Sequence, residues 1–291
     1  MRQYQMSRKY LQFSNSRIAQ ICLLICIILC LVTAASGGTK TISIPAQSRP
    51  LLGLADQLER EYAWRITYEE APLENSVDLV NGASIGTHWI ARPTAFQASF
   101  EEPQDFRSLE EKWKILDRLV AKYSGLHGTM AVLSNGDYSH IIPTTLKNKA
   151  GHIVPFEPLL NTKVSFEPAQ RSLLDTVRLI MSQVSRIRGV SIGLGTIPTN
   201  LFVQQQLLTN ADDESAREVL MRIFEDASGK RQLKGGPTAR VTWDLLNDIS
   251  YSGYFFNAHI VDPLINESTT QLPAPTPRPL RWAAPGLIPQ H

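Results

Sequence analysis

Two serines stand in the G-x-S-x-G pattern that presents a catalytic nucleophile on a sharp turn in many serine hydrolases. They are Ser84 and Ser191. Such a nucleophile needs a strand before the serine and a helix directly after it. Residues 87–93 have no apolar helical stripe, and Gly195 and Pro198 interrupt the segment after the second serine. A secreted serine hydrolase using one of these serines is therefore the alternative hypothesis, and we assign no catalytic residue.

Histidine offers both general-base chemistry and metal ligation, but the histidines of this chain show no ligand spacing. None is paired with another ligand type three or four residues away on a helix, where two side chains would aim at one ion. His140 and His259 occupy matching places in two predicted hairpins, so we expect structural, half-buried rings. We therefore assign no metal ligand. The histidines considered are His88, His127, His140, His152 and His259.

Three consecutive acids, Asp212, Asp213 and Glu214, precede an apolar helical stripe. Acids are favoured at a helix start, where free amides and the positive end of the helix dipole lie. A calcium loop would place oxygen ligands at alternate positions with a glycine turn, and this run has neither. The sequence also lacks a Walker loop and a dinucleotide-binding glycine pattern. We assign no cofactor and no cofactor-binding residue.

Aromatic side chains are concentrated in the last predicted strand, at Tyr254, Phe255 and Phe256, with Tyr251 just before it. Side chains alternate across a strand, so Phe255 must face away from its two neighbours. One face should therefore carry an aromatic ring that the helix of its own unit does not cover. These three residues are our candidate partner-binding surface. The alternatives are packing between two copies of the unit and a cell-wall or carbohydrate binder.

The N-terminus has the three regions of a secretory signal peptide, which we assign to residues 1–35. Residues 1–17 carry four basic side chains and no acid, an apolar run covers Ile21–Val32, and small residues follow. The alternative is an uncleaved anchor over residues 18–35, a length at the lower limit for crossing about 30 Å of hydrocarbon. Either way, we expect the rest of the chain outside the cytoplasm, in the periplasm or secreted.

Charge and cysteine content restrict the chemistry of the exported part. All three cysteines, Cys22, Cys26 and Cys30, lie in the apolar run, so a disulfide or thiolate metal site is excluded beyond it. Without the four basic residues of the leader, 25 Lys and Arg face 27 Asp and Glu, and the net charge changes from +2 to −2. This balance argues against nucleic acid as a partner.

The elements that must position these residues form two similar sets, and we predict an α+β fold with helices packed on small sheets. The first module, residues 41–145, has the order strand, helix, strand, then strand, helix, strand, strand. Residues 70–92 give no periodic signal and are expected to be a long loop. The elements span residues 41–45, 50–62, 64–68, 94–100, 108–125, 129–133 and 138–142.

The second module, residues 162–262, repeats this order. Pro45-Ala46-Gln47 is echoed by Pro168-Ala169-Gln170 at an offset of 123 residues, and His140 by His259 at an offset of 119. Matched echoes in the same element order indicate a tandem repeat. The elements span residues 163–166, 172–187, 190–194, 203–208, 212–228, 241–246 and 254–261.

The segments outside the two modules are polar or rich in proline. Residues 146–161 contain Pro155 and Pro158 and are interpreted as a linker. Residues 263–291 contain seven prolines, and we expect a disordered tail because few of its groups can bury apolar surface. The alternative is that Pro273–Pro279 docks into an aromatic groove of another protein.

The run Ile42-Ser43-Ile44-Pro45-Ala46-Gln47 and the strand Trp64–Tyr68 resemble the start of the short N-terminal domain shared by secretins and TonB-dependent receptors. A leucine stripe between them, at Leu52, Leu54 and Leu58, extends the likeness. The resemblance implies successive β-α-β units and an exported protein-interaction module. We therefore expect a non-enzymatic adapter that binds an envelope protein. The resemblance does not identify that partner.

Overall fold

The computed structural model describes residues 38–82, 89–102, 108–123, 128–230 and 240–261. It is a mixed α+β fold in which helices pack against small sheets, so the predicted fold class is confirmed. The predicted signal segment and the predicted tail lie outside the described residues. Within the described residues, no helix has the length and apolar character needed to cross a membrane.

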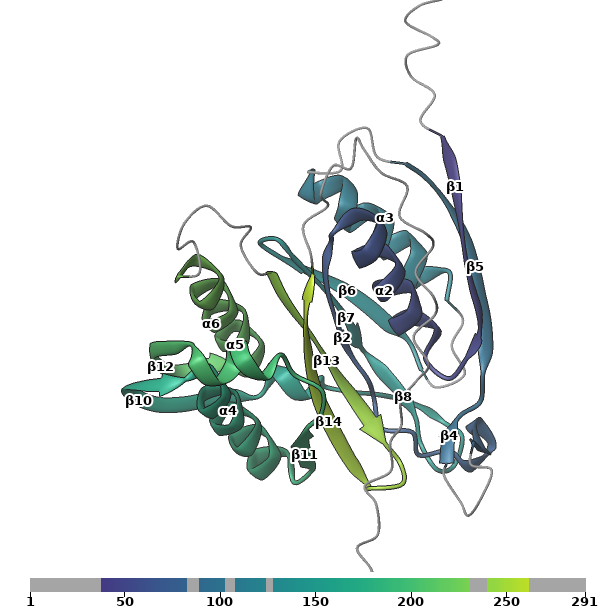
Figure 1. Ribbon diagram of the computed structural model, residues 1–291. Coiled ribbons are helices and arrows are strands. Elements are labelled where there is room, and N and C mark those ends of the chain that lie inside the picture. Colours follow the sequence, from purple (N-terminus) through teal and green to yellow (C-terminus); the bar gives the residue numbers. More distant parts are fainter. Residues whose placement is uncertain (1–37, 83–88, 103–107, 124–127, 231–239, 262–291) are drawn as a thin grey trace, which may run out of the picture.

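The first unit, residues 39–143, contains two β-α-β passages (Figure 1). Ser108 accepts a hydrogen bond from the amide of Glu111 at the start of its second helix, as the predicted capping box requires. Gly136 adopts a positive φ of 58° in the two-residue hairpin turn. The elements are β1 (Thr39–Gln47), α2 (Pro50–Tyr62), β2 (Arg65–Glu69), β5 (Thr94–Glu101), α3 (Leu109–Ala121), β6 (Met130–Asn135) and β7 (Tyr138–Pro143).

The second unit, residues 163–261, contains the same order with one additional short helix. Ser172 caps its first long helix by accepting a hydrogen bond from the amide of Asp175. The elements are β10 (Lys163–Ser172), α4 (Leu173–Arg188), β11 (Ser191–Leu194), α5 (Thr199–Gln204), β12 (Gln206–Ser215), α6 (Ala216–Lys230), β13 (Arg240–Asp248) and β14 (Gly253–Val261).

Both units contribute three strands to one continuous sheet with the order β11-β14-β13-β2-β7-β6. The units join where β13 runs parallel to β2, with Asp244 opposite Tyr68 and Leu245 opposite Glu69. In the second unit, β11 is parallel to β14, and β14 is antiparallel to β13. In the first unit, β2 is parallel to β7, and β7 is antiparallel to β6. The two sets thus share one spatial order but run in opposite directions. A two-fold screw axis that lies in the plane of the sheet, perpendicular to the strands, relates the two sets.

This relation puts the two hydrophobic cores on opposite faces of the shared sheet. Trp243 and Leu245 of β13 belong to the core under α4 and α6, whereas Ile66 and Tyr68 of β2 belong to the core under α2 and α3. Figure 1 shows the two helix pairs on opposite sides of the sheet. Each core also takes a residue from the other unit, because Tyr138 joins the second core and Leu246 packs against the first.

An outer two-stranded ribbon, β1–β5 or β10–β12, covers the helices of each unit from the side away from the shared sheet (Figure 1). The register of each ribbon shifts at the Pro-Ala-Gln echo, between Ile44 and Gln47 in β1 and between Phe166 and Ala169 in β10. A bulge accommodates proline because it leaves a residue outside the hydrogen-bonded ladder. The echoed residues therefore occupy corresponding places in the two units.

Buried polar contacts connect the units. Nη2 of Arg217 in α6 donates to Oε2 of Glu69 in β2 at 2.8 Å, with both side chains buried. Tyr138 donates to the carbonyl oxygen of Val241 at 3.1 Å. An uncompensated charge would be costly at such a depth, so these contacts favour one relative placement of the units.

The strand expected over residues 203–208 begins only at Gln206, because Val203 lies in α5. Three other segments differ from the sequence prediction. Residues 70–92, expected to be a loop, contain a 3₁₀ turn at Ser76–Asp78 and the hairpin of β3 (Leu79–Asn81) and β4 (Trp89–Ala91). Residues 146–161, interpreted as a linker, contain most of the hairpin of β8 (Thr145–Lys147) and β9 (Ile153–Pro155). The 3₁₀ turn Leu159–Asn161 follows, and its two leucines are buried in the second core. Short strands and single turns are too brief to show periodicity.

The third difference is the start of α6, which was predicted at Asp212 and lies at Ala216. The three acids belong to the end of β12, and Asp213 has a positive φ of 51°. The cap is Ser215, whose hydroxyl accepts from the amide of Glu218 at 3.2 Å while the Glu218 carboxylate accepts from the Ser215 amide. This capping box of Ser215 and Glu218 satisfies the first free amides of α6, so the acids at 212–214 have no capping role.

Candidate functional site

The predicted aromatic surface is mostly buried. Tyr254 and Phe256 are 4% and 0% exposed and pack in the second core, so they present no surface to a partner. Phe255 faces the other side of the sheet, as the alternation predicts, and meets Tyr251 edge-on at 5.8 Å between ring centroids. Tyr251 is 70% exposed. The burial has a simple reason: α4 and α6 cover the face of β14 to which two of the three rings belong.

Neither predicted serine is shown with catalytic partners. Ser84 lies outside the described residues. Ser191 is exposed in β11 and pairs with Gly253 of β14. His259 is six residues farther along β14, about 20 Å at 3.3 Å per residue. That separation is too large for a nucleophile and its base.

The edge of the shared sheet offers a surface that accepts an added strand. β11 is the last strand on its side of the sheet, and no described strand pairs with its outer edge. The amide of Gly195 donates inward to Phe256. Backbone direction alternates along a strand, so the peptide groups of Ile192 and Leu194 point to the open edge.

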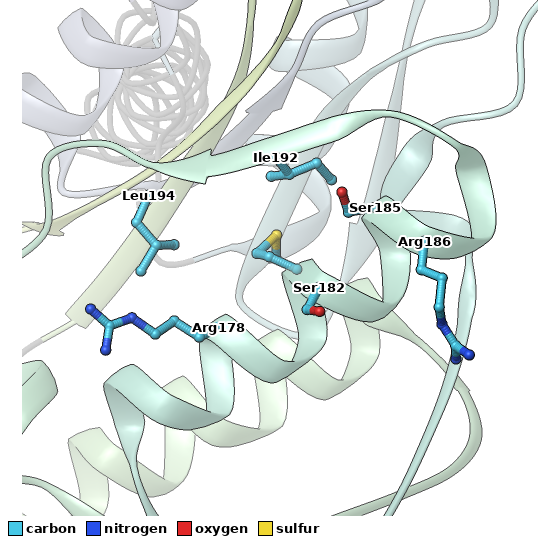
Figure 2. Close-up of a pocket in the computed structure, with 7 residues that line it drawn as sticks. Arg178, Ser182, Ser185, Arg186, Ile192 and Leu194 are labelled. Atoms are coloured by element: carbon cyan, nitrogen blue, oxygen red, sulfur yellow. The ribbon is translucent and has the colours of Figure 1, made fainter.

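A hollow of about 640 Å³ runs beside this edge between β11 and α4. Figure 2 shows Ile192 and Leu194 extending from the strand toward the helix, with Arg178 beneath Leu194 and Arg186 at the other end. Met181 is buried at its base. We call this surface the edge groove. Its lining residues are Arg178, Met181, Ser182, Ser185, Arg186, Ile192 and Leu194.

The edge groove is positively charged at its rim. Arg178 is 61% exposed, and its one ion-pair contact among the described residues is long, 3.8 Å to the exposed Asp175. Arg186 forms no ion pair with any described residue. An apolar floor between two solvated guanidinium groups suits a segment with apolar and acidic side chains. The apolar stripe of α4 and the strand after it were predicted, but the open edge depends on the order of strands in the sheet.

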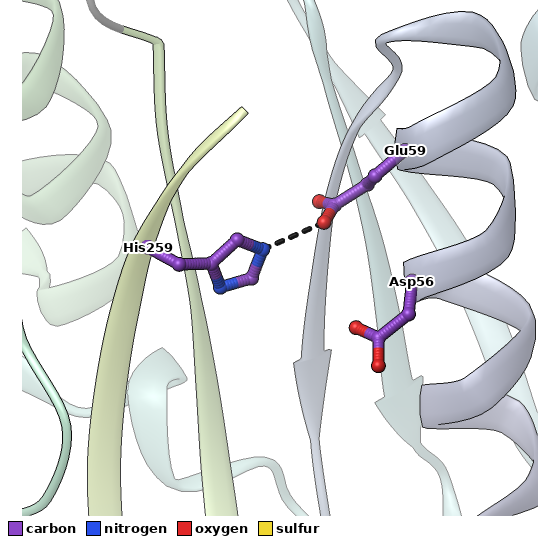
Figure 3. A group of neighbouring side chains, drawn as sticks. All are labelled: Asp56, Glu59 and His259. Carbon is purple, nitrogen blue, oxygen red and sulfur yellow. Dashed lines mark hydrogen bonds and ion pairs between the residues drawn. The ribbon is translucent and has the colours of Figure 1, made fainter. Parts of the chain in front are cut away.

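A second group of polar side chains lies where the two units meet. Asp56 and Glu59, one turn apart on α2, and His259 on β14 each offer a ligand atom, and these atoms lie within 4.8 Å of one another. Figure 3 shows both carboxylates reaching from the helix toward the imidazole. Nε2 of His259 lies 2.6 Å from Oε2 of Glu59 and 2.9 Å from the hydroxyl of Thr242.

The electrostatics of this group are set by burial and by crowded carboxylates. Burial alone would lower the pKa of His259, but the hydrogen bond and charge of Glu59, with the charges of Asp244 and Asp56, raise it to about 9. Burial raises the pKa of Asp244 to about 8, against the opposing effect of His259. In the sequence, the only local signal of this group is the spacing of Asp56 and Glu59. His259 is 200 residues away from Glu59, so no local pattern connects it with the two acids.

His140, the matching histidine of the first unit, has a different environment. It is 1% exposed, more deeply buried than expected, and Nδ1 lies 2.7 Å from the hydroxyl of Thr67. Burial, with the nearby charges of Arg217 and Lys112, lowers its pKa to about 3. It therefore stays neutral and structural, as predicted.

Comparison of the chain with protein-family models, curated proteins and solved structures finds no match. The resemblance to the secretin and TonB short N-terminal domain therefore remains a prediction, and any function must be argued from the geometry.

Proposed function

We propose that the protein is an exported, non-enzymatic adapter that binds an extended segment of another envelope protein as an added strand beside β11. The observation that carries this proposal is the open edge of β11 next to the edge groove. Main-chain hydrogen bonds to a sheet edge supply affinity, and pockets for alternate side chains supply specificity. The outward peptide groups at Ile192 and Leu194 provide the main-chain hydrogen bonds, and the hollow above Met181 provides a pocket for side chains.

The charges of the edge groove define the partner segment. Arg178 and Arg186 are separated by eight residues of α4, a rise of about 12 Å. Two residues four positions apart in an extended chain share a face and are about 13 Å apart. The partner segment therefore carries an acid at two positions of this spacing and a small apolar residue midway between them. The peptide Thr-Glu-Thr-Val-Thr-Glu-Thr has this pattern.

The binding test compares this peptide with a version in which lysine replaces both glutamates, using fluorescence anisotropy. We expect the acidic peptide to bind and the lysine peptide not to bind. Replacement of both Arg178 and Arg186 by Glu should weaken binding by at least about tenfold, equivalent to about 1.4 kcal/mol. The matched control is Arg118→Glu on the exposed face of α3, which should leave binding unchanged.

A backbone variant tests strand addition directly. Proline at position 194 removes the outward amide of Leu194 while β14 keeps its inward hydrogen bonds. Leu194→Pro should therefore abolish peptide binding, with little change in the circular dichroism spectrum. Equal affinity for both peptides, or full affinity in the folded Leu194→Pro variant, would overturn the proposed function.

A further inference from the structure

The group at the junction of the units contains more potential ligands than an ion pair needs. Glu59 is fixed by its Oε1 atom, which accepts a hydrogen bond from the amide of Ile66 at 3.1 Å. Its Oε2 atom faces His259. The carboxylate of Asp56, which is not buried, extends from one turn away toward the same space (Figure 3). Two carboxylates and an imidazole thus converge from two elements of different units.

A further carboxylate, that of Asp244 in β13, lies on the same side of the sheet as this group and interacts with it through charge. Asp244 is on the same face of the sheet as His259, because Asp244 pairs with Asn257 two residues away on β14. Asp244 is 8% exposed, and its carboxylate accepts no hydrogen bond from any described residue. Its strongest charge interactions are with His259, Asp56 and Glu59. A buried carboxylate without a donor is costly in its charged form, and a cation bound nearby would stabilise that form.

Neighbouring basic side chains do not supply that cation. Arg60 acts on Asp56 and Arg49 on Asp244 only through longer-range charge interactions. Arg49 instead forms an ion pair with Glu70 at 3.0 Å. Within the described residues, His259 is the only group that makes an ion pair with this set. The two carboxylates of Asp56 and Glu59 share the single positive charge of His259, so the group has an excess of negative charge even with Asp244 protonated.

We propose that Asp56, Glu59 and His259 bind one zinc ion that joins α2 of the first unit to β14 of the second, with the buried carboxylate of Asp244 adding negative charge nearby. One imidazole nitrogen and two carboxylate oxygens, with water in the fourth position, form a suitable tetrahedral set for zinc, whereas magnesium and calcium prefer oxygen alone. Zinc bonds of about 2.0–2.2 Å require ligand atoms about 3.4 Å apart. Small rotamer changes must therefore bring Asp56 closer and separate Nε2 of His259 from Oε2 of Glu59.

Groups behind the ligands hold them in place. Ile66 donates its amide to Oε1 of Glu59, which leaves Oε2 free for the ion. Zinc replaces the proton shared between Nε2 of His259 and Oε2 of Glu59, and that proton leaves to solvent. Backbone support of a ligating carboxylate is typical of metal sites. The site would thus fasten the units on the face of the sheet opposite to the pair of Arg217 and Glu69.

The experiment uses the full chain with its three cysteines alkylated, so that no thiolate can bind the metal. Isothermal titration with zinc should give one ion per chain and a Kd of micromolar or lower. Magnesium at the same concentrations should give no signal. Cobalt(II), which reports its geometry by visible absorption, should give the strong bands of a tetrahedral site. The melting temperature should rise with zinc concentration, because the ion binds only the folded chain.

Two variants separate ligation from folding. Asp56 forms no side-chain hydrogen bond with any residue that the structure describes, so Asp56→Asn should fold normally yet bind zinc at least tenfold more weakly. Asp117→Asn, at an exposed position of α3, is the matched control and should bind as the parent chain does. Absence of zinc binding by the parent chain, or equal binding by the two variants, would overturn the proposal. Anomalous scattering at the zinc edge from a crystal should place the ion beside Asp56, Glu59 and His259; an ion bound elsewhere would also overturn the proposal.

Discussion

His140 and His259 occupy corresponding places in β7 and β14 but meet opposite electrical surroundings. Each imidazole faces the other unit, where His140 meets the cation Arg217 and His259 meets the anion Glu59. The sequence predicts two structural histidines because both stand in apolar hairpins. It does not predict their different charge states, because these depend on side chains that the screw relation brings from the other unit.

The buried, neutral state of His140 predicts a loss of stability in acid. Its pKa falls from 6.5 to about 3 on folding, so between these values the unfolded chain binds a proton that the folded chain does not. The free energy of unfolding should therefore fall as the pH falls through this window, by up to about 1.4 kcal/mol per unit. Urea denaturation from pH 7 to pH 4 measures this slope. His140→Asn should reduce it, whereas the exposed His152→Asn should not; equal slopes would refute the assignment.

The buried pair of Arg217 and Glu69 predicts a strong effect when only one partner is removed. Glu69→Gln leaves a guanidinium group buried without its counter-ion and should cost about 3–5 kcal/mol of unfolding free energy. The double variant Glu69→Leu with Arg217→Met removes both charges and should cost less than the single change. Urea denaturation of the three proteins tests this order. A single variant as stable as the parent chain would show that the pair does not connect the units.

At the scale of elements, the sequence predicts most helices and strands well because long apolar stripes and caps are local. The helix expected over residues 50–62 has those bounds, and Ser108 and Ser172 are caps as expected. The predicted start of α6 is wrong because two cap signals compete, the acids at 212–214 and the serine at 215. The alternating strand β12 extends through the acids and leaves Ser215 as the cap.

This competition yields a direct prediction for α6. Ser215→Ala removes the hydroxyl that accepts from the Glu218 amide and should cost about 1 kcal/mol of unfolding free energy. Asp212→Ala, at an exposed position of β12, should change the stability by less than about 0.5 kcal/mol. Thermal or urea denaturation of both variants distinguishes the two caps. A larger loss in the Asp212 variant would restore the original assignment.

At the scale of the whole molecule, the sequence predicts two similar sets of elements but not their union in one sheet. The joint between β13 and β2 involves two residue pairs, Asp244 with Tyr68 and Leu245 with Glu69, from distant parts of the chain. Local periodicity contains no information on such pairings. The same limit hides both candidate sites, since the edge groove depends on strand order and the acidic group depends on the joint.

The shared sheet predicts that the units unfold together. Each core takes side chains from both units, so neither core stays complete when the other unit unfolds. Calorimetry should therefore show one transition whose calorimetric and van't Hoff enthalpies agree. Two separated transitions would mean that the units are independent domains.

The account depends most on strand addition at β11, and amide hydrogen exchange measures this directly. The protein is compared with and without the peptide Thr-Glu-Thr-Val-Thr-Glu-Thr, and β6, the strand at the opposite edge of the sheet, serves as the internal reference. We predict that the peptide slows exchange at Ile192 and Leu194 and leaves β6 unchanged, because an added strand must accept hydrogen bonds from the outward amides. Unchanged exchange at these two amides in the presence of saturating peptide, or protection confined to β6, would contradict the account.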